Sequence, residues 1–156
     1  MGEQHEVSSE VDERELRAFS RALLRDVRAL EEMLNRGMFE GGVRRIGAEQ
    51  EMFLIDDRCR PAPLAQEVLE RLDSDSFTTE LARFNLEANL SPYTFTRDCL
   101  RQMEQEAIDL IERARKAAAD CGASILLTGI LPTLELRDLG LDNMTPNPRY
   151  RALNRA

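Results

Sequence analysis

The chain has 156 residues, 42% of them hydrophobic and 32% charged, and a formal net charge of −8. A chain of this length can bury a substantial core, so we expect one compact domain. No apolar run reaches the ~18 residues that a membrane helix needs, and the negative charge disfavours nucleic-acid binding, which requires cationic side chains. We therefore expect neither a membrane span nor a nucleic-acid partner.

Residues 1–11 are acidic and polar without apolar periodicity, and they are predicted to form a disordered arm. The arm lacks the basic start and apolar stretch of a secretory signal, so we expect a cytoplasmic protein. Three cysteines, Cys59, Cys99 and Cys121, are widely spaced along the chain. Their odd number favours reduced structural thiols over disulfides or zinc ligands.

The first predicted element is a long amphipathic helix over residues 12–35. Its apolar positions lie three and four residues apart, and Gly37 follows where a left-handed cap is expected. This spacing predicts a helix whose apolar stripe packs on the chain's own sheet. A coiled-coil partner is the alternative, but the heptad pattern stops after about three repeats.

Two strands with a short helix between them are predicted next. The first strand covers Arg44–Asp56, and a helix opened by prolines runs from Pro61 through Leu72. Residues 73–76 are polar and predict a turn. The second strand runs from about Leu81 to Leu90, where Ser91 and Pro92 end it.

A second long helix and a third strand complete the predicted elements. Thr96 is expected to cap the helix, which keeps its three-four apolar spacing as far as Gly122. Residues 124–131 are almost entirely apolar, which predicts a central strand or one covered on both faces. The sequence then becomes irregular before a last helix begins at Pro148.

The two polar strands carry a distinctive set of carboxylates. Successive strand side chains point to opposite faces, so Glu49 and Glu51 share one face. In the second segment, Ala82, Phe84, Leu86, Ala88 and Leu90 alternate with Arg83, Asn85, Glu87 and Asn89. This alternation of apolar and polar residues is typical of half-exposed antiparallel sheets. We therefore predict an α+β fold, with helices on the outer face of a mainly antiparallel sheet whose other face carries the glutamates.

A carboxylate face of this kind has two interpretations. It can be an ordinary solvated sheet face, or it can bind a divalent cation through its oxygen atoms. Asn85 and Asn89 are poor strand formers, and like charges placed close together destabilise a sheet unless a cation offsets them. These points favour a site for Mg²⁺ or Mn²⁺, the ions that usually accompany ATP phosphates in enzymes.

Three segments also carry a family resemblance. Residues 46–54, 79–92 and 145–151 resemble, in order and in spacing, the N-terminal part of the glutamate–cysteine ligase family of the bacterial carboxylate–amine ligase type. The resemblance implies that residues 12–156 are the N-terminal portion of a ligase catalytic domain with a glutamine-synthetase-like fold. It further implies ATP-dependent joining of glutamate to cysteine or another amine through an acyl phosphate, as in glutathione biosynthesis, with Mg²⁺ or Mn²⁺ as cofactor.

The same resemblance assigns roles to particular residues. It makes Glu49, Glu51, Glu80 and Glu87 the metal ligands. It places Arg149 near substrate or phosphate, although an arginine beside Tyr150 at a helix start is more often a surface ion-pair residue. Asn85 and Asn89 would donate hydrogen bonds to the ligands rather than bind the metal, and no catalytic residue is assigned.

One departure from the family pattern affects the expected activity. The family completes its metal site with histidine and glutamate from later strands, whereas this chain has no histidine after His5. We therefore expect the chain alone to be inactive, to bind ATP weakly and to form a homodimer or aggregate. Two other functional classes remain open: a noncatalytic module that binds a basic partner, and a metal-dependent hydrolase.

Overall fold

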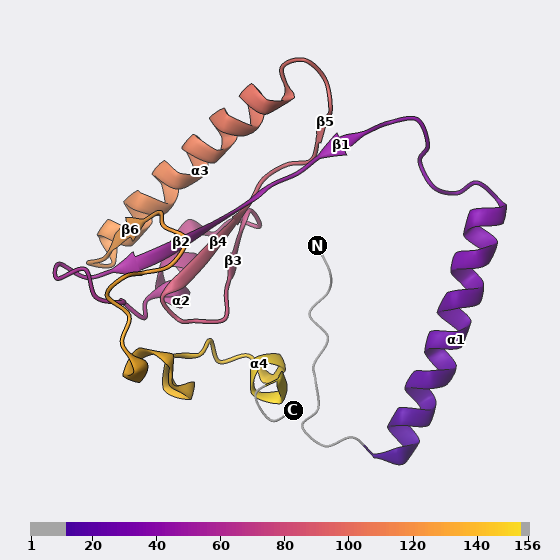
Figure 1. The fold of residues 1–156 in the computed structure, drawn as a ribbon, viewed down its shortest axis with the longest axis horizontal. Helices are drawn as coiled ribbons and strands as arrows, with labels where there is room; N and C mark the ends of the chain where they lie inside the picture. The colour runs from indigo at the N-terminus through magenta and orange to yellow at the C-terminus, as the bar shows by residue number, and fades with distance from the viewer. Residues whose placement is uncertain (1–11, 154–156) are drawn as a thin grey trace. The chain divides into compact units, whose positions relative to one another are not determined.

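The computed structural model describes residues 12–153, so the predicted disordered arm lies outside the described residues. The chain divides into two compact units. One is Arg44–Pro146, and the other consists of Met1–Val43 with Asn147–Ala156. Helices and an antiparallel sheet occur together, as Figure 1 shows, which confirms the predicted α+β class.

Helix α1, Glu13–Asn35, confirms the first predicted helix. It begins at a capping box, in which Asp12 accepts from the backbone of Arg14 and the Glu15 side chain bonds back to the backbone of Asp12. Gly37 follows it with a φ of 64°, the left-handed cap that the sequence predicts. No side chain of α1 is buried, and its packing on the sheet stays a prediction.

The larger unit is built on a four-stranded antiparallel sheet of order β3-β4-β2-β6. Its strands are β2 Glu49–Ile55, β3 Phe77–Thr79, β4 Asn85–Asn89 and β6 Ser124–Leu126. A second, two-stranded sheet joins β1 Arg45–Ile46 to β5 Tyr93–Thr94. All of these pairings are antiparallel, as the polar alternation of the strands predicts.

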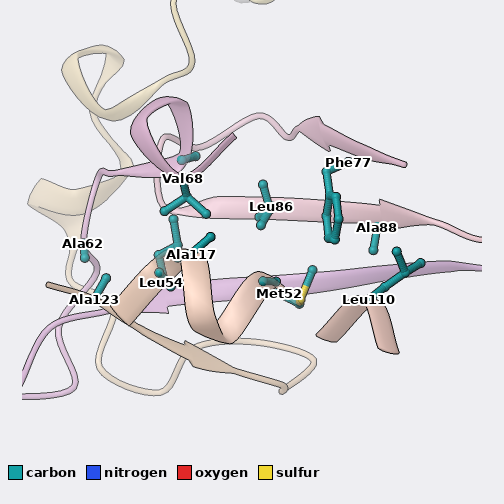
Figure 2. Close-up of a cluster of buried hydrophobic side chains, with 13 residues drawn as sticks. Met52, Leu54, Ala62, Val68, Phe77, Leu86, Ala88, Leu110, Ala117 and Ala123 are labelled. Atoms are coloured by element: carbon teal, nitrogen blue, oxygen red, sulfur yellow. The ribbon is translucent and has the colours of Figure 1, made fainter. Parts of the chain in front are cut away.

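Two helices cover one face of the four-stranded sheet. These are α2, Ala65–Leu72, and α3, Cys99–Asp120. Their buried side chains meet those of the sheet in the cluster of Figure 2, which includes Met52, Leu54 and Leu86 from the strands and Val68 and Leu110 from the helices. This arrangement confirms that α2 and α3 pack on a single apolar face.

A smaller apolar cluster lies on the opposite face, at one end of the sheet. It contains Phe53, Ile55, Phe84 and Leu131, and the rings of Phe53 and Phe84 stack with centroids 6.4 Å apart. The alternation through 82–90 predicts that Phe84 shares a face with Leu86, and this was wrong. The N–H of Asn85 bonds to the carbonyl of Ala82, which closes a turn and interrupts the alternation before β4.

Both polar strands are shorter than predicted. The second one starts at Asn85 rather than Leu81, and β3 is an additional strand that the sequence did not indicate. The first one is interrupted between β1 and β2. On the strand segment that pairs with it, pairing stops at Leu90 and resumes at Tyr93, because the intervening Pro92 has no N–H to donate.

Three further boundaries differ from the sequence predictions. Residues 61–62 pair with the end of β2, so the short helix starts at Ala65 instead of Pro61. Thr96 does not cap α3, which begins after Asp98, and its hydroxyl donates to that carboxylate. Strand β6 covers only Ser124–Leu126 and lies at the sheet edge, because the chain then leaves the sheet and buries Leu131 against the smaller cluster.

The remaining described elements are short. Two 3₁₀ turns, Leu136–Leu139 and Leu141–Asn143, lead toward α4, Pro148–Leu153, which confirms the predicted last helix. Cys59, Cys99 and Cys121 are all free thiols, as predicted. Within residues 12–153, no helix combines the length and the apolar character required to cross a membrane.

Candidate metal centre

The register of β2 and β4 sets two glutamates opposite each other. Glu51 pairs directly with Glu87, and the next pair on the same face joins Glu49 to Asn89. Directly opposed residues of an antiparallel pair have Cβ atoms about 4.5–5.5 Å apart on the same face. The buried neighbours Leu86 and Ala88 fix this orientation, since a register slip by one residue would expose them.

Glu80 joins this pair from outside the regular strands. It follows β3 in the turn before β4, and its carboxylate accepts a hydrogen bond of 3.1 Å from the backbone N–H of Leu81. One carboxylate oxygen from each of Glu51, Glu80 and Glu87 lies within 4.8 Å of the others. We refer to these three residues as the carboxylate triad.

The electrostatics of the triad disfavour three full negative charges. Burial raises the pKa of the Glu87 carboxyl above its ordinary value of 4.5, and a hydrogen bond with Glu80 raises that pKa further. The charges of Glu49 and Glu80 act in the same direction, whereas a hydrogen bond of 2.9 Å from the amide of Asn89 lowers the pKa. A divalent cation would relieve this repulsion.

Glu49 lies two positions along β2 from Glu51, on the same face and outside the triad. Together with Asn89 it lines an open hollow of about 340 Å³, whose other walls are Gly47, Ala48 and Leu90. The hollow therefore adjoins the triad through the Glu49–Asn89 pair. It offers space beside the carboxylates for part of a ligand.

The other residues singled out in the sequence are placed as follows. Asn89 donates to Glu87, as expected of a residue that supports a ligand. Asn85 pairs across the strands with Phe53, two positions from Glu87 and on the same face. Arg149 is exposed in α4, in the other compact unit, and its proximity to substrate or phosphate stays a prediction.

Two residues beside the triad could not be predicted from their local sequence. Thr78 of β3 pairs directly with Glu87. Thr145 is buried, and its hydroxyl donates to the backbone carbonyl of Glu80. Thr145 begins one of the segments that carry the family resemblance, so that segment was the available signal, but local sequence gave no reason to connect it with Glu80.

A donor set of this composition suits a hard cation. Mg²⁺ and Mn²⁺ prefer oxygen ligands, and the triad offers three carboxylates, two from adjacent strands and one from the turn before β4. The buried core behind Glu87 and the pairing of β2 with β4 hold two of the three in place. Glu80 lies in a turn outside the strands, so segments other than β2 and β4 must hold its backbone.

Comparison with known proteins leads to a family. Residues 45–156 match the model of glutamate–cysteine ligase family 2. A Frankia alni protein provisionally named glutamate–cysteine ligase 2-3 is 33% identical over 109 residues, which cover 69% of this chain and 12% of that protein. A Frankia casuarinae protein provisionally named glutamate–cysteine ligase 2-2 is 30% identical over 117 residues, or 74% of this chain and 13% of that protein.

The chain thus spans about an eighth of the length of these curated relatives. No solved structure matches it. The matched segment contains the whole sheet and all three residues of the triad. The chain therefore belongs to glutamate–cysteine ligase family 2.

Proposed function

We propose that this chain supplies part of the metal and nucleotide site of an ATP-dependent carboxylate–amine ligase that joins glutamate to cysteine. Membership of the family supports the reaction class, and the names of the Frankia relatives support the two amino-acid substrates. The observation that carries the proposal is the carboxylate triad, because strand β2, strand β4 and the turn between β3 and β4 bring three carboxylate oxygens within 4.8 Å of one another.

In this proposal Glu51, Glu80 and Glu87 bind Mg²⁺ or Mn²⁺. The ion would neutralise the phosphates of ATP while glutamate is activated for attack by the amine. The pairing of β2 with β4 holds Glu51 and Glu87, the turn before β4 carries Glu80, and Asn89 orients the Glu87 carboxylate through its amide. The hollow beside Glu49 leaves room for a substrate next to the bound ion.

The first test measures Mn²⁺ binding by calorimetry. The wild-type chain should bind one or more ions, and Glu87→Gln should lower the affinity at least tenfold, because the substitution removes a charged ligand and nearly preserves its shape. Glu104→Gln is the matched control, since Glu104 is an exposed glutamate on α3 outside the triad. Equal affinities for wild type and Glu87→Gln would contradict the metal assignment.

The second measurement addresses the nucleotide. ATP should bind more tightly in the presence of Mn²⁺ than in its absence, and Glu87→Gln should remove most of that difference. A metal that binds without any effect on ATP affinity would argue against the ligase role and in favour of a different use of the same carboxylates.

A further inference from the structure

The turn that carries Glu80 is held by a distant segment of the chain. Residues 143–145 run beside the turn, where Met144 forms an isolated antiparallel bridge with Ala82. The N–H of Arg83 donates to the carbonyl of Asn143 at 2.8 Å, and the N–H of Thr145 donates to the carbonyl of Leu81 at 2.9 Å. The turn is thus paired on its outer side although it belongs to no regular strand.

Thr145 makes two of the contacts that fix the Glu80 backbone. Its hydroxyl donates to the carbonyl of Glu80, and its N–H donates to the carbonyl of the next residue, Leu81. Thr145 is only 7% exposed, and it is the one buried polar residue among those the structure describes. Both carbonyls that flank the Leu81 N–H are therefore held by the same residue.

This geometry connects Thr145 to the Glu80 carboxylate. The N–H of Leu81 donates to the side chain of Glu80 itself, so the orientation of the peptide between the two residues determines where the carboxylate lies. Glu51 and Glu87 are fixed by the ladder between β2 and β4. Glu80 lies outside that ladder, and the hydrogen bonds from Thr145 hold its backbone instead.

The segment that carries Thr145 is itself anchored at a second point. The guanidinium of Arg60 donates to the carbonyl of Thr133 at 2.8 Å and forms ion pairs with Glu135 and Asp138. These contacts tie the stretch before Thr145 to the loop that follows β2. The segment that leads to Thr145 is therefore held in place by Arg60.

We propose that Thr145 is a positioning residue of the metal centre: it orients the Glu80 carboxylate toward Glu51 and Glu87 by holding the peptide between Glu80 and Leu81. This inference rests on the proposed metal function. It predicts that the hydroxyl of Thr145 affects metal binding only through Glu80.

The test compares Mn²⁺ affinity in Thr145→Val and Thr145→Ser by calorimetry. Valine keeps the shape but removes the donor, and the affinity should fall about tenfold, the lower end of the range for residues that support metal ligands. Serine keeps the hydroxyl, so the affinity should stay within about twofold of wild type. A valine variant that binds Mn²⁺ as tightly as wild type would overturn the proposal.

A double substitution separates positioning from general support of the fold. In a Glu80→Gln background the carboxylate is already absent, so adding Thr145→Val should produce little further loss of affinity. A further tenfold loss in that background would show that Thr145 acts on the site by another route. Should Thr145→Val not fold, Thr145→Ala removes the hydroxyl without placing a methyl group against the carbonyl.

Amide hydrogen exchange without metal keeps this proposal separate from the metal function. The Leu81 amide reports on the Glu80 carboxylate and the Thr145 amide on the contact with Leu81. Both should exchange at least tenfold faster in Thr145→Val than in Thr145→Ser. If the wild type binds no Mn²⁺ but these amides still exchange faster in Thr145→Val, the metal function is rejected and the positioning role is kept. Unchanged exchange in Thr145→Val would reject the positioning role itself.

Discussion

Glu87 is subject to two opposing requirements. In its proposed role as a metal ligand it must be charged, but burial and the neighbouring carboxyl of Glu80 raise its pKa and favour the protonated form in the metal-free protein. The hydrogen bond from Asn89 offsets only part of this effect. When no cation is bound, a charged Glu87 carboxylate beside Glu80 lowers the stability of the folded protein.

We therefore expect Glu87→Gln to stabilise the metal-free protein at pH 7. Because the folded-state pKa lies above 4.5, protonation of Glu87 favours the folded state at low pH, and this contribution is lost as the pH rises through the folded pKa. Glutamine removes the charge that causes the loss. The gain in free energy of unfolding should be about 0.2–1 kcal/mol, the range for cross-strand pairs.

Urea denaturation in EDTA measures this effect. The difference between the variant and the wild type should shrink as the pH falls toward 4, where Glu87 of the wild type is protonated in the folded state. A variant that is less stable than the wild type at pH 7 would show that the repulsion within the triad is not the dominant effect there.

The residues of the candidate site could be predicted from sequence to different degrees. Strand alternation was enough to put Glu49, Glu51 and Glu87 on one face, because the side chains of a strand have a fixed period of two. Glu80 lies near them for a different reason than expected, since it projects from a turn. Thr145 could not be predicted, because its contact spans 65 residues and depends on the packing between them.

Helix α3 allows the packing of the apolar face to be tested with one matched pair. Leu110 is 5% exposed and belongs to the main core cluster, whereas Leu100 of the same helix is 61% exposed. Leu110→Ala should lower the free energy of unfolding by about 2–5 kcal/mol, because it removes buried methyl groups and leaves a cavity. Leu100→Ala should cost about 0.5 kcal/mol or less.

Thermal or urea unfolding of the two variants checks this expectation. The substitution is identical, so helix propensity contributes almost equally to both and the difference reports burial. Equal losses would contradict the packing of α3 on the sheet. Arg113, another exposed residue of α3, would be a poorer surface control, because its guanidinium lies over the ring of Phe77, 5.4 Å from the centroid.

The elements themselves were predictable where their signal is local. The periodicity of α1 and α3 and the glycines that follow them predict both helices to within a few residues. Strand β3 and the turn after it carry no such signal, since their form depends on pairing with β4 and on the segment around Met144. The apolar run at 124–131 was wrongly predicted as a central strand, since β6 lies at the sheet edge. The alternative, a strand covered on both faces, fits better, because Ile125 packs against the main cluster and Leu126 against the smaller one.

At the level of the whole molecule, the proposed metal should act as a stabilising ligand. An ion that binds the folded state alone adds about 2.7 kcal/mol to the free energy of unfolding when its free concentration is 100 times Kd. For a chain of this size, Mn²⁺ should therefore raise Tm by roughly 5–10 °C. EDTA should reverse the shift, and Glu87→Gln should reduce it at the same Mn²⁺ concentration.

Scanning calorimetry at several Mn²⁺ concentrations provides the measurement. NaCl at matched ionic strength is the control, because nonspecific screening of a chain with net charge −8 would raise Tm with NaCl as well. Equal shifts with Mn²⁺ in wild type and Glu87→Gln would argue against binding at the triad.

The contact between Thr145 and Glu80 also has a consequence for the order of folding. Joining residues 65 positions apart requires closing a long loop, which is entropically less favourable than forming helix α3 or the neighbouring strands β3 and β4. We expect this contact to form late, after the core has assembled, so a competent metal centre would be among the last parts of the chain to appear. An ion that recognises only this final arrangement would delay unfolding and leave the speed of folding nearly unchanged.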